Sequence, residues 1–281
     1  MHLDVIALRD FYEADPMGAL VKRRLQIAAR EIWPSVRGLS VAGYGFAPPI
    51  LPPFRTEAER VLALMPAAQG AIAWPKFGAC QTALVEPYNW PLQPGALDRL
   101  ILAHALETVE RPDRLLEESW RVLAPEGRLI VLVPNRSGLW ARGDGTPFGV
   151  GRPYSTGQTE DLLSAHGFSV VRTEGALYFP PSHRRFWLRV GIPVERLGRR
   201  LDWSRFAGVL FVEAIKRVKA PRGGLRERAL SPIEAISGAV RPARPLQGAV
   251  RQKPLGAAFS GRALNYRISG EVSPAPRHRR S

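Results

Sequence analysis

The sequence predicts an α/β fold built on a mostly parallel sheet, because two apolar runs flank a helical pattern. Leu100–Leu102 and Leu129–Val133 are continuous apolar runs, which suit strands that are covered on both faces. Between them, Pro112–Leu123 has a proline suited to a first helical turn and apolar residues that recur at i, i+4 and i+7. The three segments predict a strand–helix–strand unit, from which parallel sheets are built.

The remaining elements follow from the same two patterns. We expect an N-terminal helical cap over residues 1–36, because its apolar residues share one helical face and its basic residues, Arg24 among them, share another. Apolar runs predict further strands at Leu39–Ala42, Val61–Met65, Gln81–Val85, Phe168–Arg172 and Phe206–Ile215. Helical spacing predicts helices at Arg55–Arg60, Thr156–His166 and Arg184–Leu201.

Length and composition bound the class of protein. At 281 residues and 45% hydrophobic composition, the chain is long enough for one large α/β domain with appendages. The sequence contains no stretch of the roughly 20 apolar residues that a membrane span needs, and its first residues include acids where a secretory signal would be basic. Cys80 is the single cysteine, so an intrachain disulfide is excluded. We therefore expect a cytoplasmic protein without a membrane span.

The net charge of +15 is concentrated near the end of the chain. Residues 219–281 carry 13 lysines and arginines against three acids, together with many prolines and glycines. A segment of this composition lacks the apolar content needed to order itself, so we expect a basic, disordered tail. Clustered positive charge also suits phosphate groups, which makes nucleic acid a candidate partner. The alternative is a compositional bias, since only five of the 40 basic residues are lysine.

The segment Leu97–Asn135 contains an acid, Asp98, at the start of its first apolar run and the turn RVLAPEG at Arg121–Gly127. With these residues it resembles the central motif block of class I S-adenosylmethionine-dependent methyltransferases of the type 11 domain. In that family an Asp opens a buried strand, and a later helix ends in an "RVL-P-G" turn. Here Asp98 and Arg121–Gly127 (RVLAPEG) take these places. The resemblance implies a doubly wound, mostly parallel seven-stranded sheet with an antiparallel last strand over residues 37–218. It also implies S-adenosyl-L-methionine as the cofactor.

The resemblance places the cofactor at the carboxyl ends of the strands, where open α/β sheets hold ligands. Gly43–Ala47 would be the family's glycine-rich loop, and Glu86 the acid that accepts from the adenine amino group. This chain departs from the family at three positions: Val41 and Met65 stand where acids are usual, and Ala47 replaces a glycine. The cofactor-binding residues that the resemblance implies are Gly43, Tyr44, Gly45, Met65, Glu86, Pro87 and Ala103.

His104 is the candidate catalytic residue. It follows the fourth predicted strand, where the resemblance brings methyl group and acceptor together, and an imidazole suits a general base for an O–H or N–H nucleophile. The alternative is a structural histidine at a helix start that hydrogen-bonds the backbone. Glu107 is expected to be a surface charge. The candidate residues on the substrate side are Tyr12, Asn135, Arg136, Trp140 and Tyr154.

Three functions follow from these patterns. The first is methyl transfer to a small-molecule substrate. The second is a degenerate methyltransferase fold that serves as a non-catalytic binding or scaffold protein, which Val41 and Met65 favour. The third is an RNA or protein methyltransferase that docks its partner through the basic tail. Zinc, P-loop and serine-hydrolase chemistry are excluded, because the sequence has no Cys/His cluster, GxxxxGK[ST] or GxSxG, and we predict no metal site.

Overall fold

The computed structural model describes residues 4–143, 145–183, 195, 198 and 206–217. The chain divides into two units, Met1–Arg222 and Gly223–Ser281, and all described residues belong to the first. The predicted tail lies outside the described residues, as does the predicted helix Arg184–Leu201 except for two of its positions.

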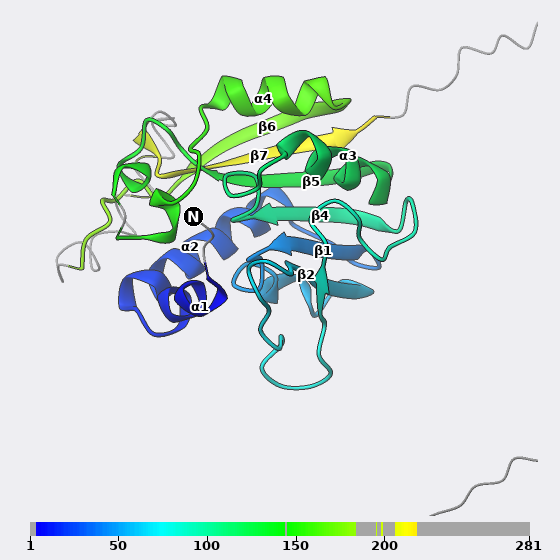
Figure 1. Ribbon diagram of the computed structural model, residues 1–281, viewed down its shortest axis with the longest axis horizontal. Coiled ribbons are helices and arrows are strands. Elements are labelled where there is room, and N and C mark those ends of the chain that lie inside the picture. The colour runs from blue at the N-terminus through cyan, green and yellow to red at the C-terminus, as the bar shows by residue number, and fades with distance from the viewer. Residues whose placement is uncertain (1–3, 144, 184–194, 196–197, 199–205, 218–281) are drawn as a thin grey trace, which may run out of the picture. The chain divides into compact units, whose positions relative to one another are not determined.

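A seven-stranded sheet with the order β3-β2-β1-β4-β5-β7-β6 forms the centre of the first unit (Figure 1). Strands β1 to β5 pair in parallel, whereas β7 runs antiparallel to both β5 and β6. The predicted fold class is therefore confirmed. The strands are β1 (Ser40–Gly45), β2 (Arg60–Pro66), β3 (Thr82–Val85), β4 (Leu97–Ala103), β5 (Leu123–Pro134), β6 (Phe168–Ala176) and β7 (Val209–Lys216).

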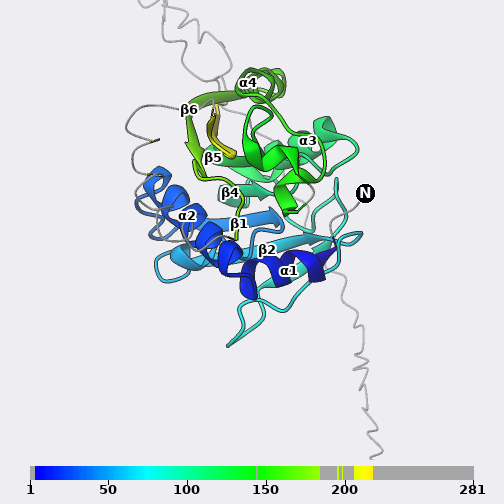
Figure 2. The same cartoon turned by 90° about the vertical axis from the view of Figure 1, so that its left-hand side faces the viewer.

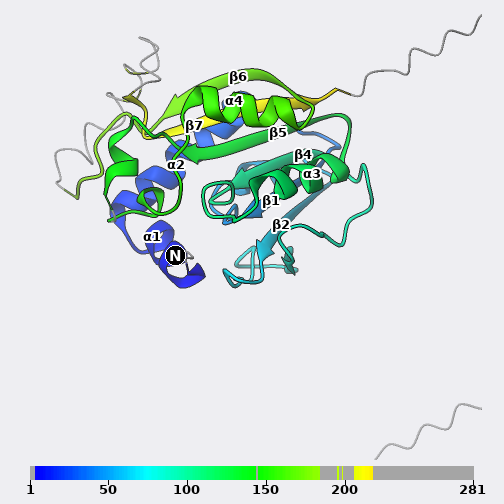
Figure 3. The same cartoon turned by 45° about the horizontal axis from the view of Figure 1, so that its top comes forward.

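Helices cover both faces of the sheet. On one face α1 (Val5–Glu13) and α2 (Pro16–Ile32) share a hydrophobic cluster with β1 and β2, and on the other face α3 (Pro112–Val122) and α4 (Thr156–Ala165) share a second cluster with β4 and β5 (Figure 2). Figure 3 shows α4 alongside β6, which it contacts. Among the helices of the described residues, none combines the length and the apolar character that a membrane crossing requires.

The connection from β1 to β2 differs from the prediction. Instead of a helix at Arg55–Arg60, the chain forms a single 3-10 turn, η1 (Pro52–Phe54), within a segment that contains four prolines. Residues 55–59 form turns and bends and Arg60 already begins β2, so too few residues remain for a helix and the predicted helix was wrong. Two further 3-10 turns, η2 (Leu139–Arg142) and η3 (Pro147–Gly149), lie in the loop after β5.

Asp98 and the RVLAPEG turn, which carry the family resemblance, each have a structural role. Asp98 accepts a 2.9 Å hydrogen bond from the backbone N–H of Ser40, which ties the start of β4 to the start of β1. The "RVLAPEG" segment forms an irregularity in the β4–β5 pairing, and the positive φ of its turn, 60°, falls on Glu126. A Cβ on Gly127 would lie 2.8 Å from the carbonyl oxygen of Ala124, so this glycine serves a close approach of the backbone.

The burial of Arg24 also differs from the prediction. It was expected on the polar face of α2, but it is 7% exposed and its guanidinium lies 3.6 Å from the carboxylate of Glu195. Glu195 in turn accepts hydrogen bonds from the backbone N–H groups of Leu177 and Tyr178. A buried cation needs such a partner, and the partner is 171 positions away in the sequence.

Candidate functional site

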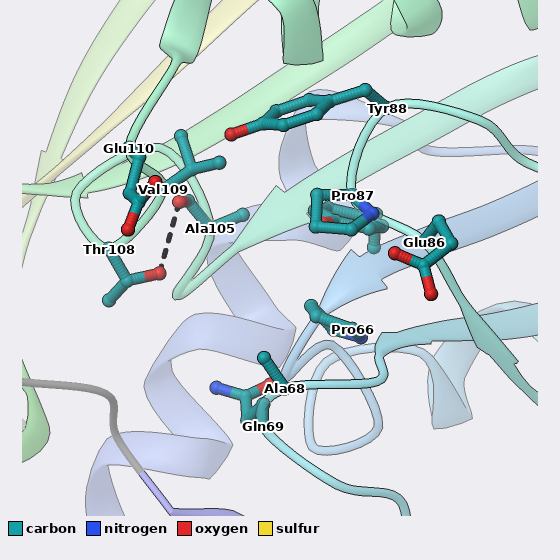
Figure 4. Close-up of a pocket in the computed structure, with 11 residues that line it drawn as sticks. Pro66, Ala68, Gln69, Glu86, Pro87, Tyr88, Ala105, Thr108, Val109 and Glu110 are labelled. Atoms are coloured by element: carbon teal, nitrogen blue, oxygen red, sulfur yellow. Dashed lines mark hydrogen bonds between the residues drawn. The ribbon is translucent and has the colours of Figure 1, made fainter.

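A cavity of about 340 Å³ lies at the carboxyl ends of four neighbouring strands. Its walls come from Tyr44 in β1, Pro66 at the end of β2, Glu86 after β3 and Ala105 after β4. Figure 4 shows these loops converging on one space, with Gln69 below it and Tyr88 above it. The volume is in the range of small-molecule sites, which measure roughly 300–1,000 Å³.

The polar groups of this cavity are few. Glu86 and Glu110 are exposed carboxylates on opposite walls (Figure 4). The side-chain oxygen of Gln69 is buried and has no hydrogen-bond partner among the described residues. Because Gln69 lines the cavity, a rotation of its side chain would turn this unpaired acceptor toward a ligand's donor.

An ion pair between the buried Glu118 and the partly exposed Arg121 holds the loop that carries Tyr88. The carboxylate of Glu118, on α3, accepts hydrogen bonds from Arg121 and from the backbone N–H of Trp90. Arg121 also donates to the carbonyl oxygens of Trp90 and Leu92. The indole of Trp90 stacks on Tyr44 with ring centroids 4.7 Å apart. Burial raises the pKa of Tyr44 strongly, so its hydroxyl stays protonated. These contacts therefore fix the loop that carries Tyr88 against α3 and Tyr44.

Gly43 and Gly45, which were expected in a loop after the first strand, belong to strand β1. Gly43 and Gly45 pair with β4, so β1 continues to Gly45 where a loop was expected. A Cβ on Gly43 would lie 2.3 Å from the Cβ of Ala47, and a Cβ on Gly45, where φ is +85°, would lie 2.2 Å from the carbonyl oxygen of Ala103. The space beside both glycines is thus occupied by this chain's own atoms.

His104 lies at the end of β4 in a buried cluster of three polar side chains. Its Nε2 is 2.7 Å from the hydroxyl of Tyr12, and its Nδ1 is 3.4 Å from a carboxylate oxygen of Glu107. His104 is 1% and Glu107 3% exposed, so the expected surface position of Glu107 was wrong. The imidazole meets side chains, not backbone, and the φ of His104 is +50°, a strained value of the kind that concentrates at functional sites.

Aromatic rings surround this cluster. Tyr12 lies edge-on to Phe11 and stacks on Phe46, with ring centroids 5.0 and 5.9 Å apart. Phe148, from the loop after β5, packs on the imidazole of His104 at 4.9 Å. Burial, with a smaller contribution from Glu107, raises the pKa of Tyr12 well above its ordinary value. Tyr12 is therefore a neutral hydrogen-bond donor in this structure.

Comparisons with known proteins agree with the strand order and the fold described above. Residues 53–131 match the family described as "Methyltransferase domain". An S-adenosylmethionine-dependent methyltransferase from Archaeoglobus fulgidus superimposes with a TM-score of 0.52 at 18% identity, over 75% of this chain and 99% of that chain. A chain of the structure described as "Complex between the Haloferax volcanii Trm112 methyltransferase activator and the putative methyltransferase" superimposes with a TM-score of 0.50 at 15% identity, over 76% of this chain and 99% of that chain. This chain has the class I methyltransferase fold. A search of curated proteins finds no sequence match.

The methyltransferase fold brings only part of the predicted site together. Of the predicted cofactor residues, Tyr44, Glu86 and Pro87 line the cavity. Ala103 is buried at the end of β4, where its carbonyl accepts from the N–H of Phe46. The side chain of Met65 is fully buried in the cluster beneath α1 and α2, and the next residue, Pro66, reaches the cavity in its place.

The predicted substrate residues separate into two groups. Tyr12 contacts His104, and Trp140 packs beside it on Phe148. Trp140 also donates to the carbonyl of Phe179, and Asn135 donates to that of Ala207, so both fasten the loop after β5. Arg136 and Tyr154 line a separate surface hollow beside α3 and α4.

Sequence reasoning missed several residues that line the cavity. Gln69 and Tyr88 lie in loops directly after β2 and β3, and Thr108 and Glu110 lie in the turns after β4. Their position after strands was the available signal, but the family motifs draw attention to the strand ends themselves. No group of three or more His, Cys, Asp or Glu side chains suited to a metal ion occurs within the part of the chain that the structure describes.

Proposed function

We propose that the protein transfers a methyl group from S-adenosylmethionine to a small-molecule acceptor. The cavity at the strand ends carries this proposal, because it combines a nucleoside-sized space with the unpartnered oxygen of Gln69. A buried acceptor without a donor costs about 1–3 kcal/mol, and a ribose hydroxyl would relieve that cost. The cavity residues therefore fit the nucleoside part of the cofactor.

Each polar residue of the cavity has a proposed role in holding the cofactor. Gln69 would accept from a ribose hydroxyl and so replace the acid that is missing at Met65. Glu86 would accept from the adenine amino group. When bound, S-adenosylmethionine supplies a methyl group on a positively charged sulfur. His104 would take the proton from the acceptor through Nε2, and burial under the aromatic rings would exclude water from that step.

Isothermal titration with S-adenosylmethionine tests the proposal. We expect binding by the wild-type protein and a loss of about tenfold in affinity for Gln69→Leu, which keeps the size of the side chain and removes the acceptor. Gln81→Leu is the matched control, because Gln81 also has an unpartnered buried oxygen but does not line the cavity. No heat of binding from the wild-type protein at millimolar cofactor would reject the proposal.

A second candidate function rests on the filled space beside the glycines. The side chain of Ala47 occupies the space beside Gly43, and Val41 and Met65 are core residues. These positions favour a non-catalytic binding protein that has kept the methyltransferase fold. In that case Gly43→Asp, which introduces a side chain into the same space, would leave the activity in cells unchanged if the protein still folds. The proposal of an RNA or protein substrate held by the tail concerns residues outside those described.

A further inference from the structure

The phenol of Tyr12 occupies a site shaped for a flat ring with a hydroxyl group. Its ring is 1% exposed and stacks on Phe46, while its hydroxyl lies 2.7 Å from Nε2 of His104. The ring of Phe148 packs on the imidazole of His104, with ring centroids 4.9 Å apart. Phe46 and Phe148 belong to the loops after β1 and β5, and His104 follows β4, so none of the three is part of α1, although Phe148 also packs on Phe11 of that helix.

Glu107 favours one tautomer of His104. Its carboxylate lies 3.4 Å from Nδ1 without hydrogen-bond geometry, and its negative charge favours a proton on that nitrogen. With the proton on Nδ1, Nε2 presents its lone pair and accepts from the hydroxyl of Tyr12. Oε2 of Glu107 has no hydrogen-bond partner among the described residues, so no other described group holds this oxygen when His104 takes the acceptor's proton. Glu107 is thus a positioning residue for the base.

Tyr12 separates His104 from an open cleft. Tyr12 and Phe46 form part of the wall of a cleft of about 150 Å³, which Lys22 and Lys76 also line. Tyr12 lies in the last turn of the nine-residue helix α1, where it contacts His104 and also lines this cleft. Movement of Tyr12 with α1 would therefore connect the cleft to His104.

We propose that Tyr12 holds the place of the methyl acceptor, and that the acceptor is a planar compound with a hydroxyl group, of the phenol class. This inference rests on the proposed function. The walls Phe46 and Phe148 favour a ring, and the lone pair of Nε2 requires a donor. A carboxylate acceptor is disfavoured, because it has no proton to donate to Nε2 and would be repelled by the negative charge of Glu107 on the Nδ1 side of the imidazole.

The proposed reaction needs only the acceptor, His104 and S-adenosylmethionine. The hydroxyl proton of the acceptor passes to Nε2, and the acceptor oxygen forms the new O–C bond to the methyl group. The S–C bond breaks with its electron pair remaining on sulfur, and the resulting imidazolium lies beside the carboxylate of Glu107. Closure of α1 with Tyr12 on Nε2 would then exclude water when no acceptor is present.

Titration of the full-length protein with phenol tests the inference, with toluene as the ring that lacks a hydroxyl. Tyr12→Phe removes the competing hydroxyl but keeps the ring and therefore the fold. We expect it to bind phenol about tenfold more tightly than the wild-type protein does, which corresponds to one lost internal hydrogen bond. Phenol should shift the Nε2 resonance of His104 in ¹⁵N NMR spectra and should bind more tightly than toluene. Tyr178→Phe, whose ring lies against Gly175 and Gly198, is the matched control and should bind phenol like the wild type.

The outcomes separate the two proposals. Equal phenol affinity of wild type and Tyr12→Phe, no phenol binding by either, an unmoved Nε2 resonance, or toluene binding as tight as phenol binding would each overturn the acceptor site. If S-adenosylmethionine still binds in the same samples, only this inference fails. If the cofactor does not bind, the proposed function fails first.

Discussion

Glu118 accepts a 2.6 Å hydrogen bond from the backbone N–H of Trp90, which lies 28 positions earlier in the chain. This bond connects α3, part of the preserved family motif, to the loop that forms a wall of the cavity. The same carboxylate pairs with Arg121, one turn further along α3. The motif helix thus supports the candidate site through its polar face as well as through its apolar one.

Glu118→Gln should destabilise the protein by about 2 kcal/mol at pH 7, because it removes the charged partner of Arg121 and weakens the bond to Trp90. Burial by itself raises the pKa of Glu118, but the hydrogen bonds from Arg121 and Trp90 outweigh it and lower the pKa below the ordinary value of 4.5. The stability that the carboxylate contributes is therefore complete above about pH 4.5 and lost as the pH falls through the folded-state pKa. Urea unfolding of both proteins from pH 7 to pH 3 should show the difference shrinking. Glu117→Gln, on the exposed face of α3, should show no such difference.

Gly45→Ala should cost about 3 kcal/mol of stability, whereas Gly38→Ala should cost about 1 kcal/mol. Both glycines have positive φ, 85° and 70°, so both substitutions strain the backbone. Only at Gly45 would the new Cβ collide with a backbone atom, the carbonyl oxygen of Ala103; nothing described lies within 4 Å at Gly38. Thermal unfolding of the pair measures the difference, and equal losses would contradict the close approach of β1 and β4.

Glu86→Gln should weaken binding of S-adenosylmethionine about tenfold, because an amide is a poorer acceptor for an amino group than a carboxylate. Glu110→Gln provides the matched comparison, since Glu110 is an equally exposed carboxylate on the opposite wall of the same cavity. Isothermal titration at one ionic strength distinguishes a specific contact from a general effect of charge. Equal losses in both variants would argue for charge alone.

The sequence predicted the fold well because apolar runs report burial directly. Leu100–Leu102 and Leu129–Val133 are fully or almost fully buried in β4 and β5, as their composition required. The extension of β1 was not predicted, because Gly43 and Gly45 have poor strand propensity and owe their extended form to pairing with β4. Pairing between distant segments is invisible to local patterns.

The candidate site was only partly predictable for the same reason. Glu86 and Pro87 follow a strand directly, so their position could be inferred from the strand order. Glu107 is buried beside His104, three positions earlier, and beneath the loop of Gly151. A Cβ added to Gly151 would lie 2.4 Å from the carbonyl oxygen of Glu107. The bond between Tyr12 and His104 spans 92 positions. The sequence predicts a surface position for Glu107 because the loop that covers it lies more than 40 positions further along the chain.

Lys216→Met should destabilise the protein by about 2 kcal/mol. The ammonium group of Lys216 donates to the carbonyl oxygens of Trp120 and Leu123, where α3 ends, and so satisfies acceptors that a helix leaves unpaired. Burial lowers the pKa of Lys216, but the two bonds compensate part of the cost of desolvation. Methionine would keep the packing of the side-chain stem against Trp120 and remove only the donors. Urea unfolding measures the loss, and Arg217→Met, at the exposed neighbouring position, should leave the midpoint nearly unchanged. An equal shift in both variants would show that Lys216 contributes only net charge.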